Sequence, residues 1–186
     1  MKSHIYNVGN PMRTVLLLLV LTSISAGQLK YDRGVDWNLP DAVQKRMEDG
    51  HMFEQYTLSD HVNPFYLRGD FDGDGKPDYA VLIVNKSSRK TALAISLSTL
   101  NAIQLLGANG KKLRVGSQAD SYDLSDFDWM DAWQVYDHTE LTPNELNDKS
   151  TLGRMAGEGL LVEKTEAASS LIYWDGTKFR WYQLSD

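Results

Sequence analysis

One stretch of the sequence carries aspartates at a spacing that restricts how the chain can fold around it. Residues 70–78 read DFDGDGKPD, which places carboxylates at loop positions 1, 3, 5 and 9 and a glycine at position 6. A loop that wraps around a calcium ion supplies hard oxygen ligands from alternating residues and turns sharply near its middle. Four carboxylates this close together repel one another unless a cation lies between them. The spacing therefore predicts a calcium-binding loop.

The expected ligands are the side-chain oxygens of four aspartates and one backbone carbonyl. They are Asp70, Asp72, Asp74 and Asp78, with the carbonyl of Lys76. An EF-hand requires a bidentate glutamate at position 12, where this chain has Val81. The runs on either side of the loop are typical of strands rather than helices. We therefore expect a calcium loop between two strands; the alternative is a solvated acidic turn that binds no ion.

The sequence around this loop resembles a known type of calcium hairpin. Residues 65–81 read FYLRGDFDGDGKPDYAV and are similar to the Asp-x-Asp-Gly-Asp-Gly-x-x-Asp hairpin of FG-GAP/VCBS repeats. The resemblance implies the same five calcium ligands. A β-propeller built from such repeats needs at least four blades, and this chain has a single copy. The chain also resembles single-copy periplasmic proteins of unassigned function that end in a Glu-Lys…Tyr-Trp-Asp-Gly hairpin, here Glu163–Lys164 and Tyr173–Gly176.

The beginning of the sequence predicts export. Val15–Leu21 reads VLLLLVL, follows a stretch containing Lys2 and Arg13 without acids, and precedes small residues. This order is typical of a secretory signal peptide, and the apolar run is too short for a membrane span. We expect residues 1–27 to be the signal peptide and 28–186 to be a single domain, with cleavage after Ser25 and a start at Met12 as alternatives.

The composition excludes several classes of function. The 186 residues contain no cysteine, which rules out a thiol nucleophile, a Cys-ligated metal centre and a disulfide framework. With 19 Lys+Arg against 25 Asp+Glu and no basic run, we expect no nucleic-acid partner and no membrane insertion after signal cleavage. An exported protein without cysteine is ordinary in a bacterial periplasm. We therefore expect a periplasmic or secreted protein.

The periodicity of the mature chain predicts an α+β fold. A helix is expected from Asn38–Asp41 to near Gly50, followed by strand-like runs with a period of two. These runs are Phe65–Leu67, Tyr79–Val84, Thr91–Leu97, Asn101–Leu106, Gly159–Lys164, Ser169–Trp174 and Lys178–Leu184. Asp175–Gly176 predicts a two-residue hairpin between the last two. The expected architecture is an antiparallel sheet of hairpins with a short N-terminal helix and a calcium loop between two strands.

Aspartates and aromatic residues alternate between residues 120 and 137. The acids are Asp120, Asp123, Asp126, Asp128, Asp131 and Asp137, while Trp129 and Trp133 stand at helical spacing. Aromatic platforms beside a carboxylate pair could bind a glycan and hydrolyse it by acid–base catalysis. A segment whose aromatics pack on the sheet while its acids face solvent accounts for the same pattern. One of these acids could also complete the calcium shell from a distance.

These features favour an exported, calcium-stabilised domain that acts by binding a protein or glycan partner, and not by catalysis. An inhibitor or immunity protein that caps a toxin or a cell-wall enzyme fits the small size, export and acidity. The alternative is a periplasmic hydrolase that uses carboxylates of residues 120–137. A hydrolase requires convergent polar groups in a pocket, whereas a binding protein exposes an aromatic or acidic patch.

Overall fold

Antiparallel strands are the main regular elements of the chain that the computed structural model describes, which is residues 39–115, 122–137 and 154–185. All of these residues belong to one compact unit, Trp37–Asp186. The predicted signal peptide and a helix start expected at Thr142–Glu145 lie outside the described residues. Within them, the helices are too short or too polar to cross a membrane.

Two helices precede the first strand of the described chain. They are α1 (Asp41–Asp49) and α2 (Met52–Gln55). The first confirms the helix predicted to end near Gly50. Its buried side chains, Val43 and Met47, stand four residues apart and therefore share one face. This face packs against the first sheet in a cluster that includes Val81 and Ile83.

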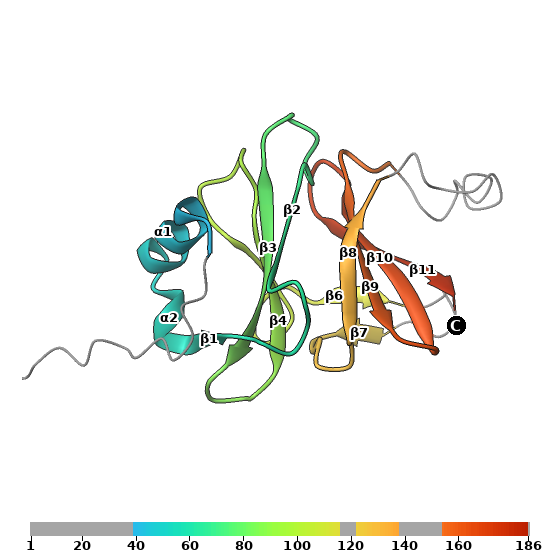
Figure 1. The fold of residues 1–186 in the computed structure, drawn as a ribbon, viewed down its shortest axis with the longest axis horizontal. Coiled ribbons are helices and arrows are strands. Elements are labelled where there is room, and N and C mark those ends of the chain that lie inside the picture. Colours follow the sequence, from blue (N-terminus) through green and yellow to red (C-terminus); the bar gives the residue numbers. More distant parts are fainter. Residues whose placement is uncertain (1–38, 116–121, 138–153, 186) are drawn as a thin grey trace, which may run out of the picture. The chain divides into compact units, whose positions relative to one another are not determined.

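The first sheet has five strands in the order β1–β3–β4–β5, with β2 also paired to β3. Their bounds are β1 (Tyr56–Leu58), β2 (Tyr66–Gly69), β3 (Asp78–Asn85), β4 (Thr91–Ser96) and β5 (Gln104–Leu106). Successive side chains of a strand point to opposite faces. Val81 and Ile83 therefore meet the helices, while Ala80 and Leu82 join a core cluster shared with the second sheet. This sheet lies between the helix pair and the second sheet (Figure 1).

The second sheet has four strands in the order β11–β10–β9–β8. Its strands are β8 (Ala132–Tyr136), β9 (Gly159–Lys164), β10 (Ala168–Trp174) and β11 (Phe179–Ser185), and a separate pair is formed by β6 (Leu113–Val115) and β7 (Tyr122–Leu124). Phe179 and Trp181 pack in the core between the sheets, whereas Tyr182 joins a cluster on the opposite face. The predicted mostly antiparallel, β-rich architecture with few helices is confirmed.

One local prediction is wrong, and one spacing has no structural counterpart. Trp129 and Trp133 stand at helical spacing, yet Trp129 lies in a turn and Trp133 belongs to β8. The connection between β10 and β11 is not a two-residue hairpin, since Trp174 pairs with Phe179 and four residues intervene. The Asp175 carboxylate accepts hydrogen bonds from the backbone N–H groups of Thr177 and Lys178, which stabilises this longer turn.

Candidate metal centre

The aspartate loop connects two paired strands of the first sheet. Gly69 at the end of β2 pairs with Asp78 at the start of β3, so residues 70–77 form the hairpin loop. Gly73 and Gly75 have φ angles of +77° and +81°, a conformation that glycine adopts without a steric penalty. The glycines therefore allow the chain to turn back on itself, as the sequence predicts for a loop between two strands.

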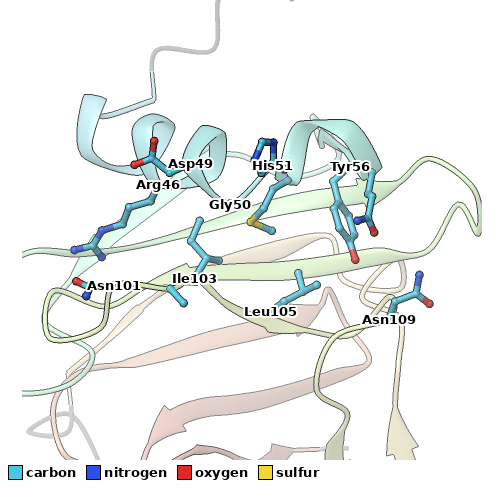
Figure 2. Close-up of a pocket in the computed structure, with 12 residues that line it drawn as sticks. Arg46, Asp49, Gly50, His51, Tyr56, Asn101, Ile103, Leu105 and Asn109 are labelled. Atoms are coloured by element: carbon cyan, nitrogen blue, oxygen red, sulfur yellow. The ribbon is translucent and has the colours of Figure 1, made fainter.

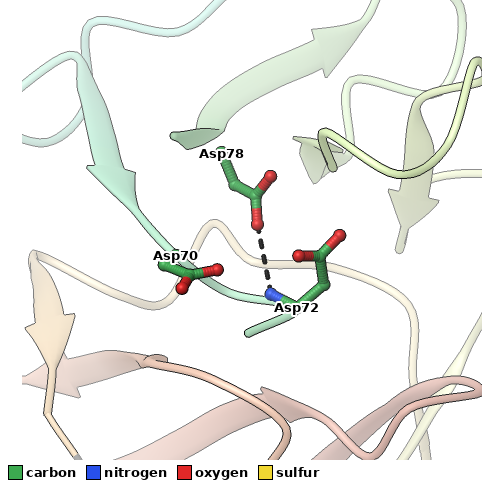
Figure 3. A group of neighbouring side chains, drawn as sticks. All are labelled: Asp70, Asp72 and Asp78. Atoms are coloured by element: carbon green, nitrogen blue, oxygen red, sulfur yellow. Dashed lines mark hydrogen bonds between the residues drawn. The ribbon is translucent and has the colours of Figure 1, made fainter. Parts of the chain in front are cut away.

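Three of the four predicted aspartates converge in this loop. Carboxylate oxygens of Asp70, Asp72 and Asp78 lie within 4.8 Å of one another (Figure 3). Asp70 and Asp72 are partly exposed, whereas Asp78 is fully buried. Carboxylate oxygens are hard ligands, and a group of three at this spacing could hold a metal ion.

Asp78 combines a buried carboxylate with three backbone hydrogen bonds. One of its oxygens accepts from Ser98 N at 2.6 Å, and the other accepts from Phe71 N at 2.8 Å and Asp72 N at 3.1 Å. The bond from Asp72 N is drawn in Figure 3. Burial raises the pKa of Asp78 to about 6, although the three N–H donors act in the opposite direction. Negative charge at this position is therefore costly without a cation.

The stability of the metal-free protein is expected to fall as the pH rises from about 4 to about 6. Asp78 titrates with a pKa of about 6 in the folded protein and of about 3.9 in an unfolded chain. In this window the folded state binds more protons than the unfolded state, so the free energy of unfolding decreases with pH. Carboxylates with lowered pKa values, such as Asp74 and Asp131, oppose this trend only at lower pH.

This pH dependence can be measured in chelator by urea unfolding, beside a 13C NMR titration of the Asp78 carboxyl group. We expect an NMR midpoint near 6 and a negative slope of stability against pH. A midpoint near 4, or stability that rises throughout the window, would contradict the raised pKa.

Asp70 and Asp74 hold the shape of the loop. The Asp70 carboxylate accepts hydrogen bonds from the backbone N–H groups of Gly73, Asp74 and Gly75 at 2.9–3.0 Å. Asp74 does not belong to the group of three. Its oxygens accept from Ser98 Oγ at 2.6 Å and from Lys76 N and Nζ at 2.8 and 3.1 Å. The hydrogen bond from Ser98, the largest of these effects, lowers the pKa of Asp74. Asp74 and the Lys76 carbonyl remain predicted ligands.

The turn after β4 forms a second wall of the site. Ser98 donates its backbone N–H to Asp78 and its hydroxyl to Asp74, and the Thr99 hydroxyl donates to Asp72. Arg46 of α1 fixes the same turn, because its Nη1 donates to Ser96 Oγ at 2.7 Å and to Leu97 O at 2.6 Å. The spacing of the aspartates gives no information on these contacts, which join residues 20 or more positions apart.

A third wall comes from the segment that precedes β9. Glu158 Oε2 accepts from Asp70 N at 2.6 Å, and Glu158 N donates to Asp70 O at 2.7 Å. A Cβ atom built on Gly157 would lie 2.1 Å from Asp70 O, so the two backbones approach as closely as glycine allows. Sequence reasoning missed Glu158, because the contact spans 88 positions and no motif surrounds it.

Acids of the 120–137 segment have structural partners elsewhere. Asp126 accepts from Thr91 N at 2.9 Å, and Asp131 accepts from Thr165 N at 2.7 Å and pairs with Lys164 at 3.0 Å. The backbone hydrogen bond from Thr165, the largest effect, lowers the pKa of Asp131 to about 2. Among the described residues, the carboxylates grouped around the loop do not include these acids. The distant acid that reaches the loop is Glu158, whereas Asp120 lies outside the described residues.

The loop, the Ser98–Thr99 turn and the Ala156–Glu158 segment thus bring three distant parts of the chain around a cluster of carboxylates. Comparison of the chain with protein-family models, with curated proteins and with solved structures found no match.

Proposed function

We propose that the protein is an exported, calcium-stabilised domain that binds a protein or glycan partner without catalysing a reaction. The calcium ligands in this proposal are Asp70, Asp72, Asp74, Asp78 and the carbonyl of Lys76. The observation that carries the proposal is the convergence of three carboxylates inside a hairpin loop. A divalent cation among them would relieve their repulsion and the cost of burying the charge of Asp78.

The donor set favours calcium over other divalent ions. The candidate ligands are all oxygen atoms, and the described group contains no histidine. Zinc favours nitrogen and sulfur ligands, and magnesium demands near-ideal octahedral geometry and keeps several waters. Calcium accepts six to eight oxygens at flexible angles, which suits a loop with alternating carboxylates.

A stabilising role for the ion fits the surroundings of the loop better than a catalytic one. Residues of three segments contact the aspartates, namely the hairpin itself, the turn at Ser98–Thr99 and Glu158. An ion bound here would connect these segments. Catalytic metal sites keep a coordination position open for water or substrate, often beside histidine ligands, and no described histidine belongs to this group.

Calcium is expected to raise the melting temperature of the protein. Binding to the folded state alone stabilises it by about 2.7 kcal/mol at about 100 times Kd, which corresponds to roughly 5–10 °C for a domain of this size. Extracellular calcium modules have Kd values of about 0.1–1 mM. Thermal melting and isothermal calorimetry with calcium, and with magnesium for comparison, measure the shift and the affinity.

Variants that each remove one carboxylate serve as test and control for this prediction. Asp72→Asn should weaken calcium binding by at least about tenfold, because it removes a charged ligand. Asp128→Asn should leave binding unchanged, since Asp128 is exposed and outside the carboxylate group. Equal calcium affinity in both variants, or no heat with the unaltered protein, would contradict a calcium site in this loop.

Two of the acids considered for the hydrolase alternative have structural partners. Asp126 and Asp131 accept backbone hydrogen bonds that hold different loops, one at Thr91 and one at Thr165. These hydrogen bonds give Asp126 and Asp131 a structural role, which favours a binding function over hydrolysis. An inhibitor or immunity protein is one specific example of such a binding protein. Fractionation of expressing cells tests export, and capture of periplasmic proteins on the immobilised domain tests for a partner.

A further inference from the structure

A pocket lies between the helix pair and the chain around β5. It has a volume of about 600 Å³ and is lined by α1, α2 and residues between Asn101 and Asn109 (Figure 2). Ligand pockets in proteins commonly measure about 300–1,000 Å³. The predicted calcium ligands do not line this pocket, so it is separate from the candidate metal centre.

The middle of this pocket is apolar. Met52, Ile103 and Leu105 line it, and all three are only partly buried although they pack against the core cluster under the helices. Figure 2 shows Ile103 and Leu105 between the two ends of the pocket. Covering them would remove apolar surface from water, which favours a ligand with an apolar body.

One end of the pocket carries a guanidinium group with an open edge. Arg46 lies beside Asn101 at this end, whereas Tyr56 and Asn109 lie at the other (Figure 2). Arg46 Nη1 donates to Ser96 Oγ and Leu97 O, which uses both of its hydrogens. Among the described residues, Nε and Nη2 have no hydrogen-bond partner and no carboxylate pairs with Arg46. Nε and Nη2 together form the edge that binds a carboxylate with two parallel hydrogen bonds.

The other titratable residues that line the pocket have partners of their own. The Asp49 carboxylate binds Lys45 Nζ at 2.9 and 3.2 Å, and His51 Nδ1 lies 3.1 Å from Glu54 Oε1. Arg46 is therefore the charge in this pocket that a ligand can neutralise. A carboxylate matches its planar edge, and the apolar middle disfavours a ligand that is charged along its length.

We propose that this pocket binds a small amphiphilic monocarboxylate. The carboxylate would pair with Nε and Nη2 of Arg46, and the apolar chain would cover Met52, Ile103 and Leu105. The pocket and the candidate metal centre share no ligand residue, although Arg46 also supports the turn whose Ser98 contacts the aspartates.

Sodium octanoate is a suitable probe, with octan-1-ol and octylammonium as ligands of matched chain length. Amide NMR spectra of the full chain should show octanoate-induced shifts at pocket residues, and calorimetry should give the affinity. We expect octanol and octylammonium to bind at least about tenfold more weakly, since neither forms the charge-assisted pair with Arg46. Equal binding of octanol, or shifts confined to residues outside the pocket, would overturn the proposal.

Variants test the same contact from the protein side. Arg46→Met keeps the apolar stem and should weaken octanoate binding by at least about tenfold, whereas Lys178→Met changes the net charge equally on a distant turn and should have no effect.

Ile103→Glu places a negative charge in the apolar middle of the pocket and should also weaken octanoate binding. Arg46 also supports the turn after β4, so Arg46→Met could fail to fold. The Ile103→Glu variant then still tests the proposal. Unchanged affinity in a folded Arg46→Met or Ile103→Glu variant would overturn the proposal.

Discussion

Alanine at position 73 is expected to destabilise the protein much more than alanine at position 75. Both glycines have nearly the same left-handed conformation, so both variants incur a backbone penalty of about 1–2 kcal/mol. A Cβ atom at Gly73 would also lie 2.1 Å from the Ala156 carbonyl oxygen, whereas a Cβ atom at Gly75 has no neighbour within 4 Å. We expect the overlap at Gly73 to add about 1–3 kcal/mol or more.

The difference between these variants measures how tightly the Ala156–Glu158 segment packs on the aspartate loop. Urea unfolding in chelator gives both free energies without a contribution from metal binding. Gly157→Ala tests the contact from the other side, because its Cβ would lie 2.1 Å from Asp70 O. We expect Gly157→Ala to resemble Gly73→Ala. Equal, small effects of all three variants would show that the segment does not contact the loop as described.

Regular elements with clear periodicity were predictable from the sequence. The strand-like runs at Tyr79–Val84 and Gly159–Lys164 became β3 and β9 with boundaries within one residue, because each is an apolar run bounded by polar turns. The strand β8 was not predictable in this way. Trp129 and Trp133 are four residues apart and both contact the core cluster, but Trp129 reaches it from the turn that precedes the strand.

The candidate site was predictable only where its residues are local in sequence. The aspartate spacing correctly predicted a loop between two strands. Three of the four predicted aspartates, Asp70, Asp72 and Asp78, lie together in this loop. The side chains of Ser98 and Thr99 reach the loop because β4 pairs with β3, and Glu158 reaches it from the segment that precedes β9. Spacing within a motif contains no information on such contacts, since they depend on strand pairing and on packing between parts of the chain that are distant in sequence.

Alanine at position 78 is expected to destabilise the metal-free protein much more than alanine at position 72. Truncation of Asp78 leaves the buried backbone N–H group of Phe71, and the partly buried ones of Asp72 and Ser98, without an acceptor. Each unsatisfied buried donor costs about 1–3 kcal/mol, and the relief of an unfavourable buried charge offsets part of this sum. We expect a net loss of about 3 kcal/mol or more.

Asp72→Ala provides the matched comparison because Asp72 belongs to the same carboxylate group but is partly exposed. It accepts one backbone hydrogen bond, from Asp74 N at 3.3 Å, and one from the Thr99 hydroxyl. We expect a loss of about 1 kcal/mol or less in chelator, together with the loss of calcium stabilisation. Urea unfolding with and without calcium separates the two expected roles, which are support of the loop by Asp78 and binding of the proposed ion by Asp72. Similar losses for both variants in chelator would mean that Asp78 is only a metal ligand, and that its three N–H contacts contribute little to the fold.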